Sequence, residues 1–130
     1  DAIALEDRAY YMAQAGNAWL TANYPEAAIT ALSEALRLQK GDPALFKDRA
    51  AAYLALERWP EGVDDLNAAL ELVPTDAEAL SMRARAHLAT ENLLAAEADM
   101  LDALKQEPEN IDFLVLRGDV REALRLSRGE

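Results

Sequence analysis

The chain repeats itself at every thirty-fourth position. Small residues recur at this spacing in two series: Gly16, Ala50, Ala84 and Gly118, and Ala28, Gly62 and Ala96. A fixed period of this length is typical of stacked structural modules that bury their apolar faces against their neighbours. The repeat therefore predicts a row of similar modules, and in such a row the work is done by an outer face and not by a reactive centre.

The modules are predicted to be helical. Ala and Leu dominate the chain, while its five prolines and five glycines stand mainly at turns, often beside an Asx residue that can cap a helix. Connections of two to four residues require neighbouring helices to be antiparallel. These signals predict an all-α fold of seven helices, near residues 3–22, 25–39, 43–57, 60–72, 77–90, 93–106 and 111–126.

One local motif departs from the period. Two stretches look like copies of one helix-start motif, Tyr24-Pro25-Glu26 and Trp59-Pro60-Glu61. In this motif proline occupies the first turn of the helix, and glutamate lies near the positive end of the helix dipole. Their spacing is one position longer than the period. We expect that the helix after Tyr24 begins one residue early.

Charged pairs follow the repeat as well. Arg49 and Arg83 each stand sixteen residues before an aspartate, whereas the first module has alanine at both places. Residues this far apart face each other in an antiparallel hairpin with a central turn. The pattern predicts ion pairs from Arg49 to Asp65 and from Arg83 to Asp99. Arg117 continues the series, and its expected partner would lie beyond Glu130, which suggests a fragment or a terminal helix with a different role.

On these anchors the chain resembles the tetratricopeptide repeat family, whose Trp, Leu, Gly, Tyr, Ala, Phe and Pro pattern it matches position by position. The resemblance spans about residues 9–120 and implies one domain over residues 1–130. Its three units would be residues 9–42, 43–76 and 77–110, with a capping helix at 111–127. The implied architecture is a right-handed superhelix of antiparallel helix hairpins. Matching positions in the three units are Met12, Ala15, Gly16, Trp19, Ala28 and Leu32; Phe46, Arg49, Ala50, Tyr53, Gly62, Leu66, Ala69 and Pro74; and Leu80, Arg83, Ala84, His87, Ala96, Met100, Ala103 and Pro108.

The resemblance also implies a binding surface. In this family the first helices of the units line a concave groove that binds extended or helical peptides. Leu20, Leu54 and Leu88 recur with the period and either form an exposed apolar stripe or pack between adjacent hairpins. The transferred groove residues are Tyr10, Asn17, Leu20, Lys47, Ala51, Leu54, Ser81, Arg85 and Leu88.

Some members of the family hold a peptide's terminal carboxylates with a clamp of lysines, asparagines and an arginine. Asn17 and Arg85 match this clamp, but Ala13, Asp48 and Ser81 replace its lysine, asparagine and lysine. We therefore do not expect chaperone-tail peptides to be the ligand.

No catalytic signature is present. The sequence has no cysteine, no phosphate loop and no motif of a serine or zinc hydrolase. The single histidine, His87, takes the position of Trp19 and Tyr53, so we expect its ring to fill a gap in a hairpin. The acidic groups Asp64-Asp65 and Glu107, Glu109, Asn110 are expected to be solvated faces and caps. The sequence predicts no enzyme activity, cofactor or metal.

Charge restricts the partners. With 13 basic and 24 acidic side chains the formal charge is -11, the wrong sign for a nucleic-acid surface. Basic or apolar partners are favoured. No apolar run approaches the roughly 20 residues of a transmembrane helix, and no leader opens the chain, which favours the cytoplasm. The first residue, Asp1, suggests a processed protein or a fragment.

Two functions fit these observations. The first is a protein or peptide scaffold that binds through its groove. The second is an assembly module, in which apolar residues within 111–126 dock against another domain or another copy of the chain. An enzyme domain would need catalytic residues from flanking sequence.

Overall fold

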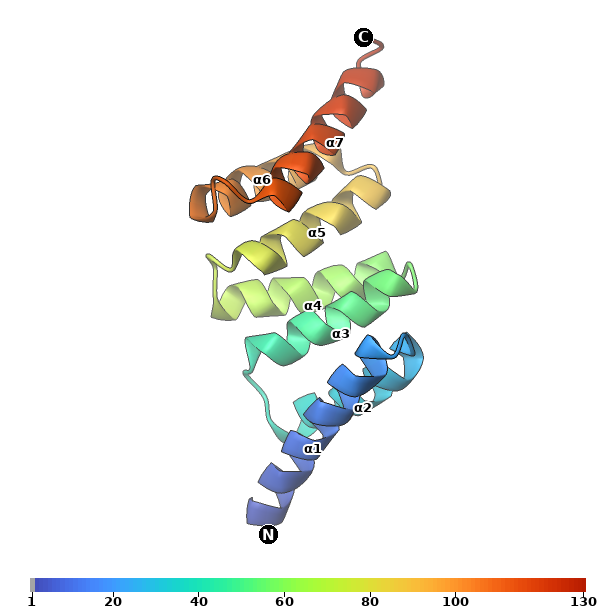
Figure 1. The fold of residues 1–130 in the computed structure, drawn as a ribbon, viewed down its shortest axis with the longest axis vertical. Coiled ribbons are helices and arrows are strands. Elements are labelled where there is room, and N and C mark those ends of the chain that lie inside the picture. Colours follow the sequence, from blue (N-terminus) through green and yellow to red (C-terminus); the bar gives the residue numbers. More distant parts are fainter. Residues whose placement is uncertain (1) are drawn as a thin grey trace. The chain divides into compact units, whose positions relative to one another are not determined.

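The computed structural model describes residues 2–130, with side chains from Ala4 onward, and these residues form seven α-helices and no strand. Every helix bound lies within two residues of the bound predicted from the sequence, which confirms the all-α fold class. The helices are α1 (Ala2–Thr21), α2 (Pro25–Leu38), α3 (Pro43–Ala55), α4 (Trp59–Leu72), α5 (Ala77–Ala89), α6 (Leu93–Gln106) and α7 (Ile111–Ser127) (Figure 1).

The helices pair into hairpins. The first hairpin is α1 with α2, the second is α3 with α4, and the third is α5 with α6. One compact unit ends at Leu72 and contains the first two hairpins, which meet where α2 contacts α3 and α1 contacts α3. The second compact unit begins at Val73 and contains the third hairpin with α7, which contacts both α6 and α5.

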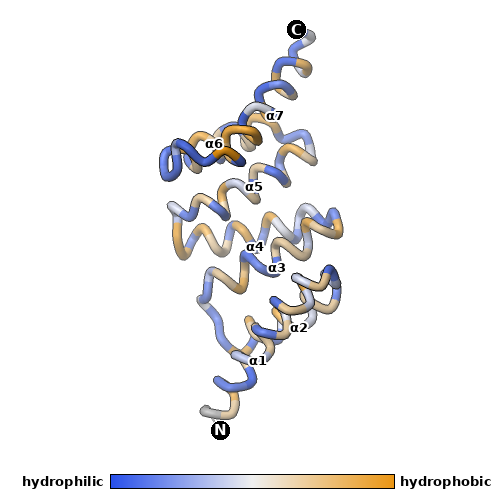
Figure 2. The backbone as a smooth tube through the Cα atoms, in the orientation of Figure 1, coloured by the Kyte–Doolittle hydropathy of each residue, from blue (hydrophilic) through white to orange (hydrophobic). Residues whose placement is uncertain are grey.

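Each unit has an alanine-rich and leucine-rich interior. Apolar and polar residues alternate along the helices (Figure 2), as expected for helices that bury one face. The core of the first unit is built from Ala28, Leu32, Ala35, Leu36, Leu45 and Ala52. Buried residues of the second unit include Leu80, Ala84, Met100, Ala103, Phe113, Leu116, Val120 and Leu124.

The first helix of each later module begins with the same cap. The side chains of Asp42, Asp76 and Asn110 accept hydrogen bonds from backbone N–H groups in the first turns of α3, α5 and α7, at 2.9, 3.1 and 3.1 Å. The spacing of the three residues equals the repeat period. A capping oxygen satisfies a donor that the helix leaves unpaired. The caps predicted from Asx residues are therefore confirmed.

The turns inside the three hairpins share one geometry. Asn23, Glu57 and Glu91, again separated by the period, have φ angles of 68°, 57° and 62°. In each turn the N–H of the next residue donates to the carbonyl five residues earlier, at 2.8, 2.9 and 2.8 Å. This bond is the mark of a helix that ends in a left-handed residue. The same turn is thus made without glycine in all three hairpins, although a left-handed residue costs roughly 1–2 kcal/mol.

The expected early start of α2 is wrong. α2 begins at Pro25 and α4 at Trp59, so the distance between the two helix starts is the period itself. Proline is the first residue of α2 but the second residue of α4. Tyr24 therefore corresponds to Arg58 and not to Trp59, and the two Pro-Glu stretches are similar sequences in different registers.

Glycines mark the closest approaches in the first two hairpins. A Cβ added at Gly16 on α1 would lie 2.5 Å from Cγ of Leu32 on α2. A Cβ added at Gly62 on α4 would lie 2.7 Å from Cδ2 of Leu54 on α3. Contacts below about 3 Å cannot be accommodated in a packed interior without a shift. The small residues thus occupy the helix crossings, as the repeat predicted.

Both predicted ion pairs are confirmed. Nε and Nη2 of Arg49 donate to the two carboxylate oxygens of Asp65 at 2.8 and 2.6 Å, and Arg83 and Asp99 form the same fork at 2.8 and 2.7 Å. The aspartates are only 4% and 5% exposed. The hydrogen bonds to these aspartates raise the pKa of each arginine above its ordinary value, so both guanidinium groups stay charged.

Candidate functional site

The first unit presents a two-helix face, because α1 and α3 are in contact. Tyr10 on α1 is 59% exposed, and Asn17 is exposed about two helical turns further along the same helix. Ala51 on α3 is half-buried. These three residues remain accessible to a ligand, and the two on α1 offer an aromatic ring and an amide.

The other groove residues predicted in this unit are half-buried, because their side chains already contact other residues. Leu20 is half-buried and packs against the core of the first unit. Leu54 is half-buried beside Gly62 of its own hairpin. Lys47 is half-buried and already interacts with another residue. These leucines therefore pack within and between hairpins, the second of the two roles considered for them, and do not form a freely exposed stripe.

In the second unit the predicted residues on α5 behave differently from one another. Arg85 is exposed. Ser81 is only 5% exposed and its hydroxyl donates to the backbone carbonyl of Glu78 at 2.8 Å, so its expected place in a groove is wrong. Leu88 is half-buried and lines a pocket of about 570 Å³ together with the C-terminal part of α7, through Ala123 and Leu126.

The face on α5 continues onto α7, which the sequence analysis missed. α5 and α7 are in contact, and Val115, Asp119 and Glu122 stand one period after Ser81, Arg85 and Leu88. Val115 is 58% exposed, and Asp119 and Glu122 are exposed. The repeat period itself was the signal that could have placed them on this face.

A further hollow, also not anticipated, lies in the first hairpin. It has a volume of about 660 Å³ and is lined by Met12, Ala15 and Trp19 on α1 and by Ala27 and Ala31 on α2, with Arg8, Thr30 and Glu34 at its edge. Trp19 is 44% exposed there. Ala15 and Ala31 occupy the positions that hold arginine and aspartate in the later hairpins, and their short side chains leave this space open.

No group of three or more His, Asp or Glu residues could hold a metal ion within residues 4–130. The His87 side chain is 17% exposed and its Nε2 lies 3.8 Å from Oδ2 of Asp99. Burial lowers the pKa of His87, Asp99 opposes this shift and Arg83 adds to it. The ring therefore fills its hairpin as a neutral group near pH 7.

None of the described helices has the length and apolar character that a membrane span requires.

Comparison with known proteins finds similarity at the level of structure. A scan against protein-family models finds no match, and a search of curated proteins finds none. The first TPR of Spaghetti (RPAP3), solved with the HSP90 peptide SRMEEVD, is 25% identical with a TM-score of 0.88, over 92% of this chain and 94% of that chain. The Arabidopsis OM64 TPR domain is 24% identical with a TM-score of 0.87, over 91% and 98%. The second TPR domain of human RPAP3, in complex with the HSP70 peptide SGPTIEEVD, is 22% identical with a TM-score of 0.84, over 90% and 98%.

Proposed function

The chain has the tetratricopeptide-repeat fold, and we propose that it is a non-catalytic scaffold that binds peptides through the first helices of its units, on the α1–α3 face of the first unit and on the α5 face of the second unit. Structures similar to it hold peptides of HSP90 and HSP70. The observation that carries the proposal is that α1 and α3 are in contact, with exposed Tyr10 and Asn17 on α1 and half-buried Ala51 on α3. Adjacent helices that present a shared face with a few polar groups are one recurring way in which proteins hold a peptide.

The ligand we propose is apolar or basic, unlike the acidic peptides of the similar structures. Those peptides end in Glu-Glu-Val-Asp. Here Asp48 and Ala13 stand where a carboxylate clamp needs asparagine and lysine, and the chain carries a formal charge of -11. Like charges at an interface are strongly disfavoured. Arg85 is the one exposed cation among the proposed site residues.

A peptide-selection experiment tests this function. The purified chain is used to select binders from a random heptapeptide display library, and the affinities of selected peptides are measured by fluorescence anisotropy. We expect selected peptides to be poor in Asp and Glu, and the peptide SRMEEVD to bind at least tenfold more weakly than they do, as roughly expected for unmatched charges. Tight binding of SRMEEVD would reverse the proposed charge preference.

Two matched pairs of variants locate the site. Tyr10→Glu and Tyr24→Glu replace tyrosines that are both 59% exposed, but only Tyr10 lies on the proposed face. Arg85→Glu is paired with Arg121→Glu, an exposed arginine on α7. Within the first pair, we expect only Tyr10→Glu to weaken binding. Within the second pair, we expect only Arg85→Glu to change the affinity, and to strengthen the binding of basic peptides because a like charge is removed. Leu54→Glu is a poor probe because Leu54 packs beside Gly62. Equal affinities within each pair would reject this site.

Self-association through α7 is not part of the proposal, because the comparisons give it no support.

A further inference from the structure

The hollow of the first hairpin has an apolar floor and an aromatic wall. Arg8, Met12, Ala15 and Trp19 line it from α1, and their spacing of four, three and four residues places them on one face of the helix. Tyr10 of the proposed peptide site is two residues from Met12 and therefore lies on the opposite side of α1. The volume of the hollow, about 660 Å³, lies within the range of roughly 300–1,000 Å³ of small-molecule sites.

The edge of the hollow carries a net positive charge. Glu34 accepts two hydrogen bonds from Arg37, at 3.0 and 2.6 Å, and its Oε1 lies 3.3 Å from Nη2 of Arg8. The hydrogen bonds from Arg37 lower the pKa of Glu34 below its ordinary value, so the cluster has two positive groups and one negative group at neutral pH. A guanidinium has five N–H donors, and Arg8 is the more weakly held of the two arginines. Arg8 therefore has donors left for an anion.

The hollow is not the packing site of a preceding hairpin. On the corresponding face of the second hairpin, Arg49 donates to Ser33 of α2, the second helix of the hairpin before it. Each later first helix begins directly after an Asx cap, so a preceding hairpin of this kind would require a turn at Arg8, one period before the cap Asp42. α1 is instead helical from Ala2 through Arg8. The same helix that rules out this turn brings the guanidinium to the edge of the hollow.

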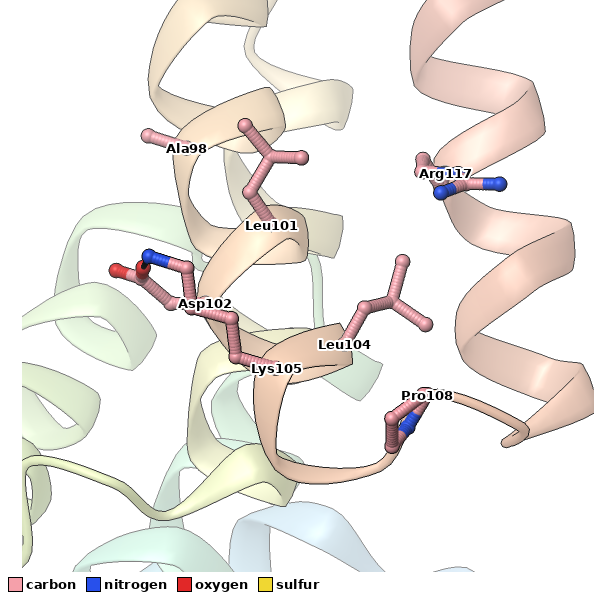
Figure 3. A pocket seen from close by; sticks show the side chains of 7 residues that line it. All are labelled: Ala98, Leu101, Asp102, Leu104, Lys105, Pro108 and Arg117. Atoms are coloured by element: carbon pink, nitrogen blue, oxygen red, sulfur yellow. Dashed lines mark ion pairs between the residues drawn. The ribbon is translucent and has the colours of Figure 1, made fainter.

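A second cavity, between α6 and α7, has apolar walls and an arginine but no aromatic ring among the residues that line it. Its volume is about 510 Å³, and Figure 3 shows Leu101 and Leu104 pointing from α6 towards α7, with Arg117 on the opposite side of the space. The two cavities thus share their size, their apolar walls and a guanidinium. The ring of Trp19, which is 44% exposed, distinguishes the first one, so an aromatic guest is favoured there.

We propose that the hollow of the first hairpin binds a small planar aromatic carboxylate. Its ring packs against the indole of Trp19 and against the alanines of the floor, and its carboxylate accepts hydrogen bonds from Arg8. Aromatic pairs and charge-assisted hydrogen bonds are both favourable in such a site. The site shares no residue with the proposed peptide site and does not depend on it.

The experiment titrates the isotope-labelled, intact chain with naphthoate and follows the indole N–H signals by NMR. The chain has two tryptophans, so Trp59 on α4 is an internal control for Trp19. We expect the Trp19 signal to shift in a saturable manner, while the signals of Trp59 and of the backbone N–H groups of Leu104 and Arg117 in the second cavity stay in place. No saturable shift of Trp19, or equal shifts in the second cavity, would overturn the proposal.

A matched pair of variants and a neutral analogue locate the guest. Ala15→Leu fills the hollow, and Ala18→Leu adds the same side chain at an exposed position of α1 that does not line it. We expect only Ala15→Leu to abolish binding, with circular dichroism confirming that both variants remain helical. Naphthamide should bind roughly three- to tenfold more weakly than naphthoate, because it offers Arg8 no charge, and Arg8→Gln should remove this difference. Unchanged binding by Ala15→Leu, or a preference for the acid that persists in Arg8→Gln, would reject the site.

Two further measurements distinguish a small molecule from other occupants. The same chemistry occurs at the C-terminus of a peptide that ends in an aromatic residue, so acetyl-glycyl-tryptophan with a free carboxylate is titrated in parallel. We expect it to bind no more tightly than naphthoate, and binding roughly tenfold tighter, or about 1.4 kcal/mol, would identify a peptide end as the occupant and exclude the small molecule. A dimer in sedimentation that Ala15→Leu dissociates would identify a second copy and exclude it as well.

Discussion

The first and second hairpins share one turn geometry but make their helix crossing with different residues. In the first hairpin glycine is on the first helix, at Gly16, and alanine is at Ala28 on the second helix. In the second hairpin the order is reversed, with Ala50 and Gly62. The polar content differs as well, because Ala15 and Ala31 replace the Arg49–Asp65 pair.

This difference shows that small side chains and a left-handed turn are the shared requirements, and that the ion pair is an addition. The pair connects more than one hairpin, since Nη1 of Arg49 also donates to Oγ of Ser33 on α2 at 3.1 Å. The first hairpin has instead an open apolar hollow beside Trp19. The arginine therefore joins the second hairpin to its neighbour, while the hairpin itself needs only steric fit.

The largest expected effect comes from breaking the pair. Arg49→Ala leaves the carboxylate of Asp65, which is 4% exposed, without its partner. We expect the free energy of unfolding at neutral pH to fall by about 3 kcal/mol, the lower end of the range for stranding a buried charge. Urea denaturation followed by circular dichroism measures it. A loss below about 0.5 kcal/mol, the size typical of a surface pair, would show that water solvates Asp65 after all.

Making the second hairpin like the first should recover much of this loss. In the double variant Arg49→Ala with Asp65→Ala, no buried charge remains, and replacing a buried pair by apolar residues is often close to neutral. We expect the double variant to be more stable than Arg49→Ala by about 1–2 kcal/mol, less than full recovery because a space opens. A double variant less stable than the single one would mean that the pair is essential to the hairpin.

Changing the crossing glycines has the next largest effect. Gly16→Ala forces Cβ against Leu32, and we expect a loss of about 1–3 kcal/mol from overpacking. Gly118→Ala is the matched control, because its Cβ meets open space and a helical Gly→Ala change stabilises by up to about 1 kcal/mol. Thermal melts of the two variants should therefore shift in opposite directions. Shifts in the same direction would remove the steric explanation of the repeated small residues in this chain.

The half-buried ring of His87, which takes the place of Trp19 and Tyr53 in the earlier hairpins, is expected to make stability depend on pH. Burial lowers the pKa of His87 below its ordinary 6.5, so the unfolded chain binds the proton more readily than the folded chain. Stability from the neutral ring is complete above pH 6.5 and falls as the pH drops from 6.5 to the lowered pKa, below which no more is lost. His87→Tyr copies Tyr53 of the second hairpin and removes this titration. The difference in unfolding free energy between the two proteins should change in favour of the variant as the pH falls through 6.5, and a constant difference would contradict the shift.

The smallest effect is expected in the hairpin turns. Arg58 lies over the ring of Tyr53 at 5.0 Å, while at the corresponding place Tyr24 packs edge-on against Trp19 at 5.5 Å. Arg58→Tyr makes the second turn like the first, and we expect a change of no more than about 0.5 kcal/mol by chemical denaturation. A larger loss would assign the Arg58–Glu61 pair, at 2.7 Å, a role beyond the surface.

Particular residues show which features of the structure could be predicted from the sequence. The period located Arg49 opposite Asp65 and Arg83 opposite Asp99, because an antiparallel hairpin with a short turn leaves a single register for residues sixteen apart. It did not locate the start of α4, predicted at residue 60 and observed at Trp59, since proline is tolerated in a first turn and nothing local distinguishes the first position from the second. Ser81 was misplaced because its hydroxyl bonds to its own helix, and burial of one residue on a helix depends on neighbours that a period does not describe.

By itself, the sequence determined the number of helices, their ends to within two residues, the hairpin pairing and the two ion pairs, since each follows from local capping, turn length and a period that repeats side-chain size and charge. Only the tertiary structure decided which surfaces stay open. Gly16 and Gly118 are the same residue at the same register, yet one is covered by Leu32 and the other faces free space. A surface is open or closed according to the side chains packed against it from other helices, and no local pattern records their absence.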